Sequence, residues 1–348
     1  MAKKDAGTDA GYQKLKSDLR AKTPGKLYVF YGEEAYLRAH HLQLLKKTLV
    51  DGLTEEFNFH RFTPENFSMD ALSDSVEAYP MMAEHSMVQV EELDLFKLSE
   101  AERERMIAIL SDIPDYCCVV FVYETVPFKP DKRQKKLWDA ISRNATIVEF
   151  RKQGERELCD WITRHFAAQG KQIDFELCRY LIVQTGGAMT TLNGEIGKIA
   201  AFCSGTKVTK ADINAVVEPV LEAVVFDISN AIAAGNFSLA LTKLRTLLQK
   251  QEEPISIMAA IGSQMRRLHA ARVLIDSGKG ADSLMQLYGL GEYPARLTMN
   301  QAGRLSTAFC RRAVLLCLQI DEQLKTSADA PERLLELLIL QLAQGDKA

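Results

Sequence analysis

Residues 27–45 read LYVFYGEEAYLRAHHLQLL, and they decide how the first part of the chain folds. The five residues 27–31 have the length and apolar character of a buried strand. Gly32 follows as a turn, and a helix is expected over residues 34–50. The helical period puts on one face of this helix Leu37, His41, Leu44, Leu45 and Thr48. Strand, glycine turn and helix in this order open many nucleotide-binding domains, so the turn has to be tested for a phosphate site.

The turn lacks the residues of a phosphate-binding loop. Such a loop, GxxxxGK[ST], holds phosphates and magnesium with backbone N–H groups, a lysine and a hydroxyl. Residues 32–38 contain no second glycine, no lysine and no Ser or Thr at the needed spacing. Glu33 and Glu34 favour the start of a helix but repel a phosphate there. We therefore expect no ATP hydrolysis by this chain alone.

Four further strands are predicted in the first 150 residues, because short apolar or alternating runs recur between helical segments. The strands are expected at residues 57–62, 86–92, 117–125 and 145–150, and the helices at residues 69–78, 99–113 and 131–143. The run CCVVFVYET at 117–125 is the most apolar and is expected at the centre of the sheet. This alternation predicts a parallel, doubly wound α/β domain over residues 1–150.

The rest of the chain is predicted to be all-α. Helical patterns fill residues 151–217 as a small helical domain, and Glu218-Pro219 marks its end because the residue before a proline disfavours helix. Residues 218–348 are predicted to form a third domain, a bundle of longer helices. The helices of these two domains are expected at about 154–169, 174–184, 190–203, 209–217, 224–234, 238–249, 255–277, 304–325 and 332–344.

Composition narrows the function classes. The 348 residues carry a net charge of −3, so any contact with DNA has to come from a local patch. Seven cysteines without a CxxC pair and six histidines without HxxxH predict no metal site, and no cofactor is expected. Free thiols suit a reducing cytoplasm, and no apolar run approaches the ~18 residues of a membrane span. No catalytic residue can be nominated, so whether the chain is itself an enzyme stays open.

Several segments, taken in order, resemble the delta subunit of the bacterial DNA polymerase III clamp loader. The resemblance begins at about Leu27 and extends over nearly the whole chain. It is carried by the following segments: LYVFYGEEAYLRAHHLQLLKK (27–47), DALSDSVEAYPMMAEHSMVQVEEL (70–93), DKRQKKLWDAI with NATIVEF (131–150), GGAMTTLNGEIGKIAAF (186–202), KVTKADINAVVEP (207–219), FDISNAIAAGNFSLALTKLRTLLQKQEEPISIMAAIGSQMRRL (226–268) and DEQLKTSADAPERLLELLILQL (321–342). The resemblance implies an AAA+-like α/β domain without a working phosphate loop, a small helical domain and a C-terminal helical collar domain.

The resemblance also implies a function in DNA replication. A delta subunit joins the ATP-hydrolysing tau/gamma subunits and delta-prime in a hetero-pentamer. It binds the beta sliding clamp and helps to open it for loading onto primed DNA. Two alternatives stay open: an AAA+-like adaptor or ATPase with an atypical phosphate loop, and the delta-prime subunit. Delta-prime usually has a zinc module and a Ser-Arg-Cys motif, and neither occurs here.

The family's clamp-binding position falls on Pro80, Met81 and Met82. In the family, an apolar pair just after the second helix of the α/β domain inserts into a pocket of the clamp. Leu72, Val76 and Tyr79 are expected to face the sheet, and Pro80 to end the helix. Met81 and Met82 then fall in a loop, exposed as a small hydrophobic anchor. The family usually has a leucine and an aromatic residue here, so this chain departs from its pattern.

Two basic clusters are candidate contacts for DNA or for neighbouring subunits. They comprise Lys132, Arg133, Lys135 and Lys136 in the first domain and Arg266 and Arg267 in the third. Each neutralised phosphate would add salt-dependent affinity, although such clusters are more often the solvated faces of helices. Lys325 also matches the family's pattern, and the sequence gives no role for it.

Overall fold

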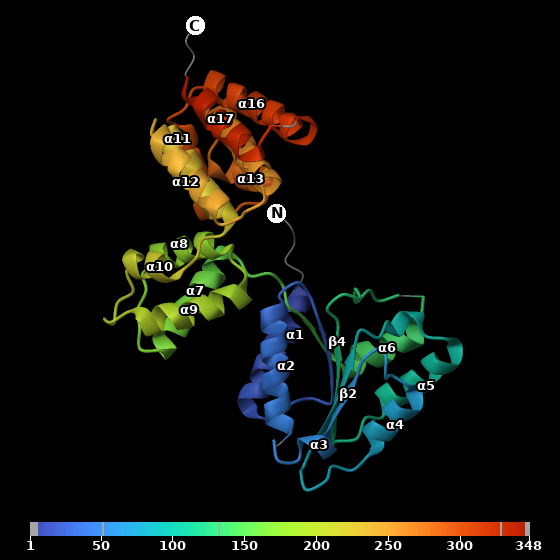
Figure 1. Ribbon diagram of the computed structural model, residues 1–348. Helices are drawn as coiled ribbons and strands as arrows, with labels where there is room; N and C mark the ends of the chain where they lie inside the picture. The colour runs from blue at the N-terminus through green and yellow to red at the C-terminus, as the bar shows by residue number, and fades with distance from the viewer. Residues whose placement is uncertain (1–5, 51, 132, 328, 345–348) are drawn as a thin grey trace. The chain divides into compact units, whose positions relative to one another are not determined.

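A computed structural model describes residues 6–50, 52–131, 133–327 and 329–344 of the chain. The chain divides into two compact units, Met1–Gln153 (unit 1) and Gly154–Ala348 (unit 2), which Figure 1 shows in blue to green and in green to red. The change from a mixed to an all-helical pattern in the sequence falls close to this division. The further division of unit 2 at residue 217 stays a prediction.

Unit 1 is built on a five-stranded parallel sheet with the strand order β2-β3-β4-β1-β5. The strands are β1 (Leu27–Tyr31), β2 (Phe59–Phe62), β3 (Ser86–Glu91), β4 (Cys117–Val122) and β5 (Thr146–Glu149). All six residues of β4 are buried, and β4 is the middle strand. The prediction that the most apolar run forms the centre of a parallel sheet is therefore confirmed.

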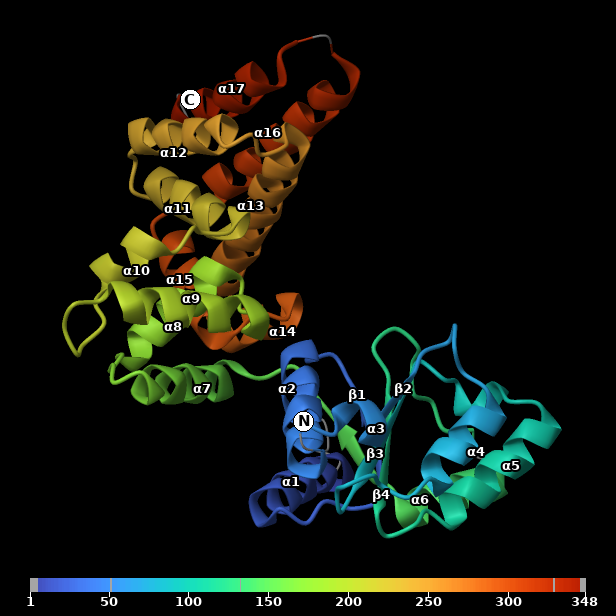
Figure 2. The same cartoon turned by 60° about the horizontal axis from the view of Figure 1, so that its bottom comes forward.

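Helices cover both faces of this sheet. On one face lie α1 (Ala6–Ala21) and α2 (Ala35–Leu49), and on the other lie α4 (Met69–Glu77), α5 (Glu100–Ser111) and α6 (Lys135–Asn144), as Figures 1 and 2 show. The two remaining elements of unit 1 are short: α3 (Glu55–Asn58) and the 3-10 helix η1 (Leu95–Lys97). Helix α1 was not expected from the sequence. Helix α5 begins after Ser99, whose side chain caps the helix by accepting a hydrogen bond from the N–H of Glu102.

Successive strand residues face the two helical layers in turn, as the pleat of a strand requires. Val29 belongs to the core that also contains Leu137 of α6. Phe30 points the other way, where its ring lies 5.2 Å from the ring of Phe150, which in turn lies 5.9 Å from that of Tyr12 in α1. Apolar contacts thus bury both faces of the sheet. The packed sheet in turn determines where the turns and loops at its edges lie.

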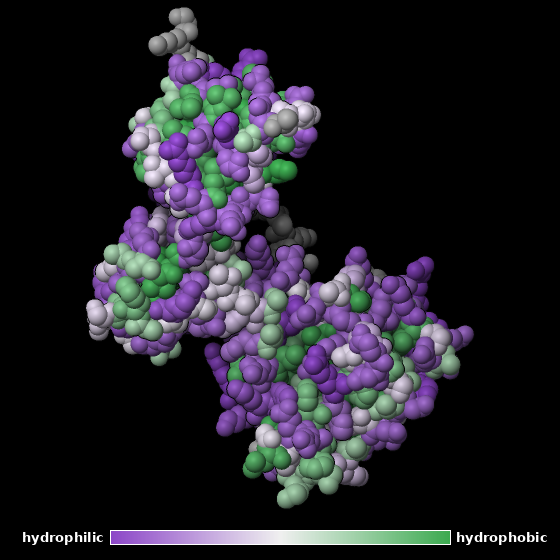
Figure 3. Space-filling view, viewed as in Figure 1, coloured by the Kyte–Doolittle hydropathy of each residue, from purple (hydrophilic) through white to green (hydrophobic). Residues whose placement is uncertain are grey.

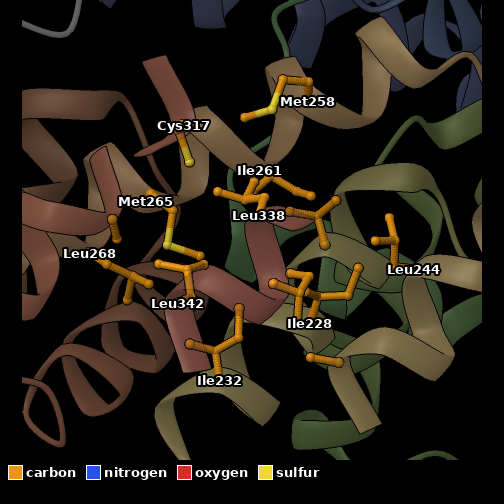
Figure 4. Packing of buried hydrophobic residues seen from close by; sticks show 14 of the residues in the cluster. Ile228, Ile232, Leu244, Met258, Ile261, Met265, Leu268, Cys317, Leu338 and Leu342 are labelled. Carbon is orange, nitrogen blue, oxygen red and sulfur yellow. The ribbon is translucent and has the colours of Figure 1, made fainter. Parts of the chain in front are cut away.

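Unit 2 is all helical. Its first helices are α7 (Glu155–Ala168), α8 (Phe175–Thr185), α9 (Met189–Phe202) and α10 (Lys210–Val216), and its later helices are α11 (Leu221–Ala233), α12 (Phe237–Gln249), α13 (Pro254–Asp276), α14 (Ala281–Tyr288), α15 (Glu292–Ala302), α16 (Thr307–Thr326) and α17 (Pro331–Ala343). Helices α14 and α15 were not expected from the sequence. Figure 4 shows Ile261 and Met265 of α13 packed among buried side chains of α11, α16 and α17. The long α13 is therefore the central element of this core.

No helix in the described part of the chain is long and apolar enough to cross a membrane.

Candidate functional site

The turn between β1 and α2 has the strand–glycine–helix order of a phosphate loop, but its backbone is hydrogen-bonded to another segment of the chain. Gly32 has φ +120°, and a Cβ at this position would lie 2.4 Å from the carbonyl oxygen of Phe150. The N–H of Glu34 donates to that same oxygen at 2.9 Å, and the N–H of Phe150 donates to the Tyr31 carbonyl at 2.7 Å. The glycine is therefore required by the close passage of the chain after β5, which a larger residue would obstruct.

The Arg38 side chain also makes hydrogen bonds at this turn. Its side chain is 4% exposed, its Nη1 donates to the carbonyl of Gly32 at 2.7 Å, and its Nη2 meets Oε1 of Glu124 at 2.9 Å. Burial raises the pKa of the neighbouring Glu34 carboxyl, since the Lys152 and Arg38 charges and a backbone N–H offset the desolvation only in part. The Arg38 guanidinium is thus already bonded to a backbone carbonyl and a carboxylate of the chain itself. This supports the expectation that the turn holds no phosphate site.

At the carboxyl ends of β3 and β4, consecutive backbone N–H groups point at one anion, and this anion is a side chain of the protein itself. The Glu92 carboxylate accepts hydrogen bonds from the N–H of Thr125 at 3.0 Å and of Val126 at 2.7 Å, and also from the N–H of Glu124 and the hydroxyl of Thr125. Burial opposes ionisation of Glu92, yet these bonds outweigh it and hold the pKa of the carboxyl below its ordinary value. Consecutive N–H groups of this kind could have bound a phosphate, but here they bind a side chain.

The candidate clamp-binding residues lie in the loop between α4 and β3. Met81 is 55% exposed and Met82 is 95% exposed, in agreement with the expected loop, while Pro80 is half-buried. The expected place of Tyr79 was wrong: α4 ends at Glu77, the backbone is extended at the next residue, and the Tyr79 ring is 80% exposed. Since the helical period stops before residue 79, its side chain leaves the buried face of α4.

The loop is tied to α3 by one fully buried side chain. Asn58, the last residue of α3, donates from Nδ2 to the carbonyl of Met81 at 2.9 Å and accepts from the N–H of Met81 at 2.7 Å. The next residue, Met82, has φ +52°, a conformation that residues other than glycine seldom adopt. The loop therefore has a defined backbone although its side chains are exposed.

Exposed apolar side chains gather around this tie. The apolar patch, as we call it, comprises Leu53, Phe57, Tyr79, Met81 and Met82, with exposed fractions from 55% to 95%. Figure 3 shows apolar surface at the end of unit 1 where Figure 1 labels α3. A patch of large apolar side chains on a polar surface is typical of a protein-binding site.

Two residues of the apolar patch, Leu53 just before α3 and Phe57 within it, were not expected from the sequence. The sequence predicted a strand over residues 57–62, whereas residues 55–58 form α3 and the strand begins at Phe59. The acidic pair Glu55-Glu56 after Thr54 was the signal for a helix start that could have been used. Only the fold, however, brings Asn58 to Met81.

The candidate basic residues lie in both units and are not gathered into one site by any single unit. Lys132 lies outside the described residues. Arg133 is exposed and makes a salt bridge to Asp131 at 3.0 Å, and Lys135 and Lys136 are exposed in the first turn of α6. In α13 of unit 2 lie the remaining two, Arg266, which is exposed, and Arg267, which is half-buried. The contacts predicted for all of them stay predictions.

The described residues contain no group of three His, Cys, Asp or Glu side chains placed to hold a metal ion. All seven cysteines are buried and free. Burial raises the pKa of the Cys117 thiol to about 11 and that of Cys317 to about 12. Cys117 and Cys317 are therefore packing residues rather than nucleophiles at neutral pH.

Comparison with known proteins agrees with the geometry. Two sequence profiles match the chain, "DNA polymerase III, delta subunit" over residues 28–151 and "DNA polymerase III delta subunit, C-terminal domain" over residues 222–342. The chain is 27% identical over 327 residues to the DNA polymerase III subunit delta of Bacillus subtilis, with 92% of this chain and 94% of that protein covered. It is 24% identical over 270 residues to a probable DNA polymerase III subunit delta of Aquifex aeolicus, with 76% of each covered.

A solved structure shares the fold. It is the Bacillus subtilis DNA clamp loader delta protein, with a TM-score of 0.61 and 24% identity over 95% of this chain and 99% of that one. The two profiles together match more than half of the chain and describe the same family. The chain therefore belongs to the DNA polymerase III delta-subunit family.

Proposed function

We propose that this delta subunit of the clamp loader binds the beta sliding clamp through the apolar patch and helps to open one interface of the clamp. The clamp can then be placed on primed DNA. The observation that carries the proposal is the exposure of Met81 and Met82 on a backbone that is fixed by hydrogen bonds to the buried Asn58 side chain. Two long apolar side chains held in this way can fill a pocket without first ordering the loop, which favours affinity.

Methionine suits this task although the family usually has other residues here. Its side chain is unbranched and polarisable, so it adapts to an irregular pocket. Phe57, 56% exposed in the same apolar patch, supplies an aromatic ring of the kind that dominates binding hot spots. The contact therefore draws on both α3 and the α4–β3 loop.

A DNA polymerase III subunit works in a complex with other subunits. In the proposed function, the partners are the ATP-hydrolysing tau/gamma subunits and delta-prime, in a hetero-pentamer that acts in the cytoplasm. The β1–α2 turn is filled by the chain's own groups, so the energy of the cycle comes from ATP bound by the neighbouring subunits. Residues 218–348, the predicted collar domain, would join the ring of subunits.

The test is clamp binding by the purified chain, with the sliding clamp from the same source. The variant Met81→Ala/Met82→Ala is expected to bind about 30- to 1,000-fold more weakly, since each hot-spot truncation costs about 1–2 kcal/mol and the two together about 2–4 kcal/mol. Its melting temperature should stay near that of the wild type, because both side chains are exposed. The control is Leu287→Ala, which removes a side chain that is 62% exposed on α14 of unit 2 and does not belong to the apolar patch.

Each outcome decides something different. Loss of binding only in the methionine variant supports both the function and the site. Binding by all three chains with equal affinity refutes the site. If the wild type does not bind the clamp, the proposed function is wrong, and nucleotide binding by the wild type would then favour the alternative of an AAA+-like ATPase.

A further inference from the structure

The tie between Asn58 and Met81 uses both polar groups of the Asn58 side chain. Both polar atoms of one fully buried amide bind the N–H and the C=O of a single residue, 23 positions further along the chain. This exchange of two hydrogen bonds copies the pairing of opposite residues in an antiparallel sheet. A side chain thus does here what a neighbouring strand would do elsewhere.

The tie limits how the loop can move. With its N–H and C=O both held, Met81 cannot rotate its peptide groups without depriving the buried Asn58 amide of a hydrogen-bond partner, which is costly. Met82 follows directly, in a left-handed conformation that a free loop would seldom populate. The direction in which both methionine side chains leave the backbone is therefore set by Asn58.

We propose that Asn58 is a positioning residue of the clamp contact. It does not touch the clamp; it holds the Met81 backbone so that Met81 and Met82 are ordered before binding. The inference rests on the proposed function and adds the residue that prepares the site. Preorganisation of this kind lowers the entropic cost of association. Without the amide, the loop still carries both methionines but has to be ordered by the clamp itself.

The variant Asn58→Ala tests this. We expect clamp binding about 10-fold weaker than in the wild type and faster hydrogen exchange of the Met81 N–H. The matched control is Asn66→Ala. Asn66 also bonds one backbone N–H and one carbonyl in a nearby turn, but those of two residues: it accepts from the N–H of Thr63 at 2.7 Å and donates to the carbonyl of Arg61 at 3.2 Å. The control should leave both clamp binding and Met81 exchange unchanged.

A double-mutant cycle separates positioning from general stability. Asn58→Ala is combined with Met82→Ala, and clamp affinity and melting temperature are measured for all four chains. If Asn58 acts by presenting the methionines, its effect on affinity shrinks when Met82 is already truncated, while its effect on the melting temperature persists. The single Met82 change keeps the affinity within a measurable range.

The outcomes are distinct. Unchanged binding by Asn58→Ala overturns the inference and leaves the proposed function standing. An equal loss of affinity with and without the Met82 side chain also overturns it, since Asn58 would then act through stability alone. If the wild type does not bind the clamp, the proposed function fails first and the inference fails with it.

Discussion

The β1–α2 turn and the α4–β3 loop of unit 1 are both held by hydrogen bonds to residues that are distant in the sequence, but with opposite results. In the turn, the bonds use up the Glu34 N–H and the Arg38 guanidinium, which a phosphate would otherwise need. In the loop, Asn58 bonds only to the backbone of Met81, and the Met81 side chain stays exposed. In the turn, the groups that could bind a phosphate are bonded to the chain itself, so no phosphate site is left. In the loop, only the backbone is bonded, so the side chains stay available for a partner.

The largest effect is expected at the turn, for Gly32→Ala. The new Cβ would lie 2.4 Å from the Phe150 carbonyl oxygen, and φ +120° is strained for any residue with a Cβ. We expect a loss of roughly 3 kcal/mol or more in the free energy of unfolding, because the backbone has to shift. Urea denaturation measures it. The control Gly52→Ala adds a Cβ that meets nothing within 4 Å and should cost little. A wild-type unfolding curve for Gly32→Ala would show that the close passage is not needed.

A medium effect is expected at the apolar patch, for Phe57→Ala. Truncating a partly exposed aromatic residue next to the Asn58 tie should weaken clamp binding by about 1–2 kcal/mol, or roughly 5- to 30-fold. Its melting temperature should hardly change. Titration of the clamp with the variant, beside Leu287→Ala, measures the effect. Unaltered affinity would confine the contact to the α4–β3 loop and sharpen the contrast with the turn.

The smallest effect is expected for Glu92→Gln. The folded state lowers the pKa of this carboxyl below its ordinary value of 4.5, so its stabilisation is complete above that pH and is lost as pH falls through the folded-state pKa. The variant should be less stable by roughly 1 kcal/mol at pH 7, a modest figure because the group is near the surface. Thermal melts of both proteins from pH 7 to pH 3 should converge at the acid end. A gap that stays constant with pH would exclude ionised Glu92 as its cause.

The layout of the elements followed from the sequence because it depends on local periods. Alternation of strands and helices predicted the parallel sheet, and the most apolar run predicted its central strand, β4. The missed elements had weak local signals. The glycines at 280, 289, 291 and 303 flank α14 and α15 and leave only short helical segments between them, so tertiary packing decides that these helices form.

The candidate site followed from the sequence only in part. The position of Met81 and Met82 in a loop came from the end of the helical pattern and from the family resemblance. Leu53 and Phe57 stayed unnoticed because an exposed apolar residue is unremarkable in a sequence until others lie beside it. Of the residues predicted to share one face of α2, Leu37, His41 and Leu45 are buried, whereas Leu44 is 39% exposed.

The sequence by itself determined the class of each segment, the absence of a phosphate-loop motif and the family to which the chain belongs, because these depend on residue type and on near neighbours. Only the tertiary structure decided what occupies the turn and what fixes the loop. Phe150 meets Gly32, Glu124 meets Arg38, and Asn58 meets Met81 across 23 to 118 residues of chain. The physical reason is that a buried polar group must find a partner wherever the packed sheet and helices bring one, and sequence spacing does not record that place.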